Sequence, residues 1–428
     1  MTPWPRELVP RSQFVSPSVV RQVIAACAIA FGFALAGRTA QGQMPVSRAS
    51  AIAAAINRGP RTAIARADSA EADAVLVRAK QFDNPGLGVS YTKSTPTQHY
   101  SLDIPIDAPW MRRPRIGSAR AGLNAATSRF VYTTASLSYA TDTTYTRALA
   151  IARRAALSQR NARDADSLLV LARVRRDAGD ASELDVQLAA VFDGQLANSA
   201  AIDSLEAVNA LLAVQVAMGL SGETATIVLS DSLTMDAADA GSRTGSSGAG
   251  SSSSLLISAA EQELVAADFT VQFERRRLLA APSLAIGFES QNPGGQNGAL
   301  PTIGIALPLP IFNRNGAGIL AAQAAQSRSA ALLTLARLEI NAAIAQARRA
   351  LTVARTRAER SARLVDGADN IAALSLLAYR EGASTLLNVL EAQRTSRATL
   401  AQYIDDLATA RNAAGLVRLL TLSAATKP

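Results

Sequence analysis

Two halves of the sequence repeat each other at an offset of 203 residues. The segment RRDAGDASELDV resembles YREGASTLLNV, and their glycines, Gly179 and Gly382, lie 203 positions apart. Pro105 and Pro308 have the same separation. One offset therefore extends from a proline-containing segment, through a long intervening stretch, to a glycine-containing turn. A repeat of this kind predicts that each half folds into the same set of elements.

Each half contains two short segments in which apolar residues alternate with small or polar ones. These are LGVSY and YSLDIPI in the first half, and LAIGF and TIGIALPLPI in the second. Alternation with a period of two is the pattern of a β-strand with one apolar face. Polar stretches that contain proline separate the two members of each pair and are typical of turns. We therefore expect two β-hairpins, at 86–107 and 283–311.

A long helix is predicted after each hairpin, at 117–177 and at 318–380. The first would have 61 residues and a length of about 90 Å. Gly179 and Gly382 follow these segments, and glycine readily takes the left-handed conformation that ends a helix.

A shorter helix is predicted after each glycine, at 182–218 and at 384–420. Ser182 with Asp185 three residues later fits a capping box, and we expect Ser384 to cap the second short helix. A helix of 37 residues spans only about 55 Å, less than its long partner. We expect 255–280 to stack on the first short helix, and 61–80 to stack on the second.

The N-terminal segment has the pattern of a secretory signal peptide, which we place at 1–42. Arginines precede the apolar run at 23–36, and small residues follow it. The run of 14 residues is shorter than the roughly 20 that span a bilayer as a helix. Lipidation of Cys27 is an alternative. No segment after residue 43 is expected to cross a membrane as a helix.

The remaining chain divides into a first repeat at 43–240, a linker at 241–254 and a second repeat at 255–428. The linker is composed almost entirely of glycine and serine, which is typical of a flexible connection.

Composition argues against an enzyme, a metal site and a cofactor. The chain has one cysteine and one histidine, which leaves no set of zinc ligands and no Ser–His or Cys–His pair in a plausible context. The net charge of +9 comes with arginines scattered along helical segments rather than gathered in a basic block. We interpret these arginines as solvated helix faces and expect no binding of nucleic acid.

The predicted strands have one apolar face each. Four strands cannot close a barrel, and lipid does not tolerate an open sheet edge. A secreted chain with four such strands is therefore expected to pool them with other copies in a membrane; a small soluble sheet that caps a helical bundle is the alternative. The residues expected to face lipid are Leu87, Val89, Tyr91, Leu102, Ile104, Ile106, Leu284, Ile286, Phe288, Ile303, Ile305 and Leu307.

The order of these parts resembles the TolC-like outer membrane factors. The motifs that carry the resemblance are NPGL, IPID, AGDASELDV, LPLPIFNRNGAGI and YREGAS…LNVLEAQR. The LPLPIFNRN segment is most similar to the cation-efflux branch. The resemblance implies a mainly α-helical homotrimer in which long helical hairpins form an α-barrel through the periplasm and each chain gives four strands to one shared β-barrel in the outer membrane.

The same resemblance implies a passive exit duct in a tripartite efflux system. A periplasmic adaptor would join the helical tip to an inner-membrane pump of the proton-driven efflux type. A non-channel periplasmic adaptor or structural coiled coil is the alternative function.

The resemblance also assigns residues at the tip. Asn388 and Glu391 match a pair of acidic residues that line the periplasmic gate, and Asn388 departs from the acidic pattern. The adaptor would dock on residues of the two helix turns, namely Gly179, Ser182, Leu184, Asp185, Gly382, Ser384, Leu386 and Leu387.

Overall fold

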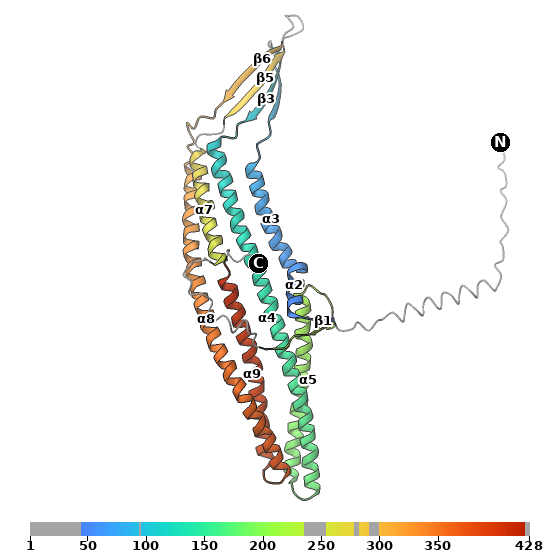
Figure 1. Cartoon of the computed structure of the whole chain (residues 1–428). Helices are drawn as coiled ribbons and strands as arrows, with labels where there is room; N and C mark the ends of the chain where they lie inside the picture. The colour runs from blue at the N-terminus through green and yellow to red at the C-terminus, as the bar shows by residue number, and fades with distance from the viewer. Residues whose placement is uncertain (1–43, 94–95, 235–253, 278–281, 291–298, 424–428) are drawn as a thin grey trace, which may run out of the picture.

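The protein is a long molecule with a β-sheet at one end and two helix turns at the other (Figure 1). The computed structural model describes residues 44–93, 96–234, 254–277, 282–290 and 299–423. The predicted signal peptide and nearly all of the predicted linker lie outside these residues.

Seven helices make up most of the described chain. The two long ones are α4 (Pro109–Asp177) and α8 (Gly316–Arg380), with 69 and 65 residues. The shorter helices that return from the tip are α5 (Glu183–Ala217) and α9 (Leu386–Thr421). The helices that lead into the sheet are α3 (Pro60–Lys80) and α7 (Leu255–Arg276), and α2 (Arg48–Arg58) precedes α3.

The offset of 203 residues holds at the tip of the molecule. The long helices end at Asp177 and Arg380, and the returning helices begin at Glu183 and Leu386. The predicted long and short helices are therefore confirmed as elements.

The first long helix starts earlier than we predicted, at Pro109 instead of Gly117. Pro109 takes the first helical position, where a missing N–H costs nothing. Pro114 lies inside the helix and leaves the carbonyl of Trp110 without its usual donor. The guanidinium of Arg276 on α7 donates to this carbonyl at 3.1 Å. Contact with another helix thus compensates for a residue that a sequence-based assignment reads as a helix breaker.

The end-to-end stacking of the short helices is the reverse of what we predicted. The backbone N–H of Leu255 at the start of α7 donates to the carbonyl of Leu422 after α9 at 3.1 Å. At the end of α5, a Cβ atom on Gly219 would stand 3.5 Å from the carbonyl oxygen of Arg58 on α2. Hence α9 continues into α7, and α5 continues into α2 and α3 (Figure 1). Nearness in the sequence was the wrong guide, because the chain after α5 crosses to the other hairpin, where Arg411 of α9 donates to the carbonyl of Thr234.

The sheet at the distal end has four antiparallel strands in the order β2-β3-β5-β6. The strands are β2 (Gly86–Tyr91), β3 (Gln98–Pro105), β5 (Ser283–Ser290) and β6 (Ala299–Ala306). Both predicted hairpins are present, and β3 pairs with β5 to join them. The last strand ends at Ala306 instead of Ile311, because Pro308 and Pro310 have no N–H to donate to a ladder.

Near the middle of the molecule lies a second, two-stranded sheet that we did not predict. A short parallel pair joins β1 (Met44–Val46) to β4 (Ile227–Leu229). The buried Tyr145 of α4 donates a 2.8 Å hydrogen bond to the carbonyl of Val46. Arg153 of α4 and Arg411 of α9 donate to the carbonyls of Leu233 and Thr234, both at 3.0 Å. These bonds hold β1 and the segment after α5 across the two helical hairpins.

One helix of the described residues, α5, is long and apolar enough to cross a membrane by length and composition. Our expectation that no later segment meets this criterion is therefore wrong. The criterion alone is weak evidence for a membrane span, because core helices of soluble proteins also meet it. In this chain α5 packs along α4 and begins in the polar turn at the tip.

Candidate functional site

The four-stranded sheet has one apolar and one polar face. Leu87, Leu102, Ile286 and Ile303 form one row across all four strands. Further rows on the same face contain the other predicted lipid-facing residues that lie within strands, namely Val89, Tyr91, Ile104, Leu284, Phe288 and Ile305. Ile106 and Leu307 lie one residue beyond their strands.

The apolar side chains on the edge strands β2 and β6 are exposed to an unusual degree. Leu87, Ile303 and Ile305 have 75%, 79% and 74% of their surface exposed. Tyr100, which we did not predict, stacks on Phe288 with 4.8 Å between ring centroids. The opposite face carries small or polar residues such as Ser101, Gly287 and Thr302. An exposed apolar surface of this extent marks a contact with lipid or with another protein.

The sheet and the helices below it have their free edges on the same sides. In the described sheet β2 and β6 are the edge strands. The neighbouring helices pack in the corresponding order, α3-α4-α7-α8. Because β2 follows α3 and β6 precedes α8, one side of the molecule presents β2 with α3, and the other presents β6 with α8 (Figure 1).

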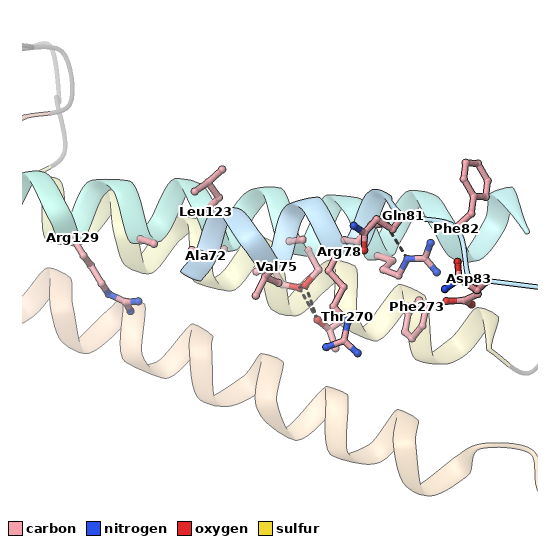
Figure 2. Close-up of a pocket in the computed structure, with 18 residues that line it drawn as sticks. Ala72, Val75, Arg78, Gln81, Phe82, Asp83, Leu123, Arg129, Thr270 and Phe273 are labelled. Carbon is pink, nitrogen blue, oxygen red and sulfur yellow. Dashed lines mark hydrogen bonds between the residues drawn. The ribbon is translucent and has the colours of Figure 1, made fainter. Parts of the chain in front are cut away.

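A groove lies between α3, α4 and α7 where the helices meet the sheet. Its volume is about 970 Å³, and Arg78 and Thr270 lie near its centre, with Phe82 and Phe273 closer to the sheet (Figure 2). The Oγ atoms of Ser118 and Thr270 are 3.0 Å apart across the junction of α4 and α7.

Arginines near the start of α4 bind the carboxyl end of α3. Arg115 donates to the carbonyl of Ala79 at 3.1 Å and to Asp107 at 2.7 Å, and Arg112 donates to the carbonyl of Lys80 at 3.1 Å. The last carbonyls of α3 are therefore capped by cations, which favours the helix carboxyl end. We interpret the groove as the joint that orients the sheet on the helices.

At the other end, the two turns have the same backbone geometry. Gly179 and Gly382 have φ values of +84° and +78°. The N–H of Asp180 donates to the carbonyl of Arg175, and that of Ala383 donates to the carbonyl of Ala378, both at 2.8 Å. This bond is the mark of the Schellman motif, which needs a left-handed residue in the position that each glycine fills.

The capping residues of the turns are Ser182 and Thr385. Ser182 forms the predicted capping box, in which its Oγ accepts from the N–H of Asp185 at 3.1 Å and its N–H donates to the Asp185 carboxylate at 3.0 Å. Thr385, and not Ser384 as we predicted, caps α9, since the N–H of Asn388 points to its hydroxyl at 3.5 Å. Thr385 lies 203 residues after Ser182, so the repeat offset itself identifies it.

The predicted docking leucines divide into exposed and buried ones. Leu184 and Leu387, which are 203 residues apart, are each 67% exposed. Leu386 is 1% exposed and packs in the tip core with Val186 and Val389. Of the three, Leu386 therefore has a packing role, and the other two remain available to a partner.

We did not predict one contact that joins the two turns. The guanidinium of Arg175, at the end of α4, donates to the carbonyl of Tyr379 and lies 4.6 Å from the centre of its ring. Burial raises the pKa of the Tyr379 phenol, and Arg175 acts in the opposite direction. Arg175 and Tyr379 are the first residues of the two repeat segments RRDAGDASELDV and YREGASTLLNV. Once the two turns are known to be adjacent, these positions predict that the two residues are neighbours.

The predicted gate residues lie one helical turn apart on α9. Asn388 and Glu391 are both exposed, and the Asn388 amide donates to the Ser384 hydroxyl at 3.2 Å. Among the residues that the structure describes, no group of three or more His, Cys, Asp or Glu side chains could hold a metal ion.

The architecture is a set of long helical hairpins with a small sheet at one end, and one face of that sheet is apolar. No family model and no curated protein matches the sequence. Solved structures do match. A membrane protein from Pseudomonas aeruginosa is 20% identical with a TM-score of 0.71, over 87% of this chain and 92% of that one.

Two further similar structures are named channel or outer membrane proteins. CusC, described as forming a transmembrane channel, is 16% identical with a TM-score of 0.72, over 87% of this chain and 91% of that one. The outer membrane protein VceC from Vibrio cholerae is 16% identical with a TM-score of 0.69, over 87% and 95%. The resemblance to TolC-like outer membrane factors is thereby confirmed at the level of the fold.

Proposed function

We propose that this chain is the outer-membrane exit duct of a tripartite efflux system. It would conduct substrate passively from an inner-membrane pump and a periplasmic adaptor, through the helical tunnel and out across the outer membrane. The observation that carries the proposal is the sheet with an exposed apolar face at one end of helices that are far longer than the sheet needs for support.

Several copies of the chain could close into a ring, because the edge strands β2 and β6 can pair between neighbouring copies. The four strands alternate in direction, so β6 of one copy meets β2 of the next in an antiparallel manner. About eight strands are the minimum for a transmembrane barrel, so at least two copies are needed. The sequence resemblance implies a homotrimer, in which α3 of each copy would lie beside α8 of the next.

In this assembly the apolar face meets lipid and the polar face lines the lumen. The helical tip then lies farthest from the membrane, where the exposed Leu184 and Leu387 are available to the adaptor. Glu391 would line the periplasmic gate, with Asn388 one turn before it. Selection of the substrate would belong to the pump, and the resemblance to the cation-efflux branch favours a proton-driven one.

A periplasmic adaptor or structural coiled coil is the weaker alternative. Such a protein has no need of a sheet with apolar side chains as exposed as Leu87 and Ile303, which are 75% and 79% exposed on the edge strands. The fold relatives that are named as channels also favour the duct.

Cell fractionation tests the proposal. We expect the protein in the outer membrane, migrating on an unheated gel as an oligomer that heating converts to monomer. A monomer in the soluble periplasmic fraction would refute the duct and favour the alternative.

A further inference from the structure

A band of positive charge lies where the helices meet the four-stranded sheet. Segments 78–83, 107–115, 274–277 and 313–315 together contain nine Lys or Arg residues and three Asp or Glu residues. They lie at the ends of α3 and α7 and at the starts of α4 and α8, all at the sheet end of the molecule (Figure 1). These cations are scattered in the sequence and gathered only by the fold. We call the four segments the basic collar.

Hydrogen bonds hold the four segments of the basic collar side by side. The side-chain amide of Asn315, just before α8, donates to the carbonyl of Glu274 on α7 at 2.9 Å. The guanidinium of Arg276 on α7 donates to the carbonyl of Trp110 on α4, and Arg112 of α4 reaches the last carbonyl of α3, both at 3.1 Å. The basic collar is therefore continuous from the free edge at α3 to the free edge at α8.

The chain neutralises only part of this positive charge. Asp107 pairs with two arginines of α4, at 2.7 and 3.4 Å. Arg113, Arg275 and Arg314 are exposed, and none of them makes an ion pair with another residue that the structure describes. Three guanidinium groups per copy are therefore available to an anionic partner.

Large apolar side chains lie among these cations. Phe82 is 67% exposed, and the guanidinium of Arg112 is 4.2 Å from the centre of its ring. Phe312, which is 100% exposed, comes two residues before Arg314, and Trp110 is 40% exposed. A small anion would leave these side chains in water. A partner with both a phosphate and a long apolar part would contact the cations and the rings together.

The two ends of the sheet differ in charge. At the end away from the helices, segments 92–97 and 291–298 join the strands of the two hairpins, and Lys93 is their only ionisable residue. The basic collar lies at the other end, directly after the exposed apolar face. Under the proposed function, on which this step rests, this end lies at the inner leaflet of the outer membrane. Tryptophan is enriched at such membrane–water interfaces.

We propose that the basic collar binds anionic phospholipids of the inner leaflet, with the lipid phosphate at the exposed arginines and the acyl chains along the apolar face of the sheet. A guanidinium group matches a phosphate through two parallel hydrogen bonds. Basic segments beside a membrane are attracted to anionic lipid, whatever their other contacts. An acidic protein is the competing occupant, and the continuity of the basic collar with the apolar face favours lipid.

The fluorescence of Trp110 tests the proposal. The other tryptophan, Trp4, lies in the predicted signal peptide, and Trp4→Phe leaves Trp110 as the only tryptophan of the full chain. The oligomer is reconstituted in bilayers of phosphatidylglycerol and phosphatidylcholine in equal parts, with bromine on the acyl chains of one lipid or the other. Bromine quenches a tryptophan that it contacts, so the ratio of quenching reports which lipid lies beside Trp110.

We expect phosphatidylglycerol to be preferred beside Trp110 by about threefold to tenfold at low salt, because each cation near an anionic surface attracts it. The preference should fall when the salt concentration is raised, since salt screens exposed charges. The double variant Arg113→Gln with Arg275→Gln removes two exposed cations near Trp110 and should lower the preference by at least about twofold.

Arg163→Gln is the matched control. It removes an exposed arginine of the same helix, α4, far from the sheet, and should leave the preference unchanged. Unheated gels establish that each variant assembles like the parent.

Equal quenching by the two brominated lipids in the parent would overturn the proposal and favour an acidic protein as the occupant. A preference that persists in full in the double variant would also overturn it. Conductance of the same bilayers separates the two claims. An oligomer that conducts but shows equal quenching keeps the duct and refutes the lipid site, whereas one that prefers phosphatidylglycerol but never conducts refutes the duct and keeps the lipid site.

Discussion

The hydroxyl of Ser361 on α8 donates a 2.6 Å hydrogen bond to the buried carboxylate of Asp406 on α9. Ser158 and Asp203, each 203 positions earlier, form the same bond between α4 and α5. Arg357 at 2.7 Å and Gln402 at 2.9 Å also contact the Asp406 carboxylate. Each long hairpin thus has a polar pair that sets how its two arms align.

Removal of Asp406 should destabilise the protein. Asp406→Ala leaves Ser361 and the end of Arg357 without their partner, and we expect a loss of about 2–3 kcal/mol in the free energy of unfolding. Urea unfolding of the detergent-solubilised protein measures it.

The neighbouring Asp405 is the control. Its side chain is 51% exposed and 3.7 Å from Arg154, so Asp405→Ala should cost less than about 1 kcal/mol. Equal losses for the two variants would show that Asp406 has no special role.

The turn glycines should resist replacement. Gly179→Ala and Gly382→Ala force a residue with a Cβ into the left-handed region and should each cost about 1–2 kcal/mol. Gly194→Ala, inside α5 with open space around the new Cβ, should instead stabilise by about 0.5–1 kcal/mol. Thermal unfolding compares them, and a neutral result at both turns would contradict the capping role.

The two faces of the sheet should differ in their tolerance of charge. Ile303→Lys places an ammonium on the apolar face and should cost about 2–4 kcal/mol if that face meets the middle of the bilayer. Thr302→Lys, one residue away on the polar face, should assemble normally. The measurement is the fraction of heat-modifiable oligomer extracted from outer membranes. If both variants assemble equally, the apolar face does not meet lipid.

The gate assignment makes a prediction for ion block. Glu391→Gln removes the carboxylate ring that three copies would form, so block of the conductance by added divalent cations should weaken. Glu381→Gln changes an exposed carboxylate of the turn and should leave block unchanged. An unaltered block in Glu391→Gln would remove Glu391 from the gate.

The sequence was most informative where a local rule decides the structure. The alternation around Leu87 and Ile303 predicted which side chains share a face, and the repeat predicted the turns at Gly179 and Gly382. The offset also identifies Thr385 as a cap, although a plausible serine beside it led us to the wrong residue.

Other features of the fold depend on tertiary contacts and could not be predicted from local sequence patterns. The helix start at Pro109 depends on Arg276 from another helix. The stacking of α9 on α7 depends on the hydrogen bond between Leu255 and Leu422, which are far apart in the sequence. The contact of Arg175 with Tyr379 joins residues 204 positions apart and needs both turns in place.

Reconstitution of the purified oligomer in planar lipid bilayers tests the central claim most directly. The account predicts discrete, stable conductance steps from the parent protein and none from the Ile303→Lys variant. A parent protein that is folded and oligomeric in detergent, yet adds no conductance to the bilayer, would contradict the assignment of this chain as a duct.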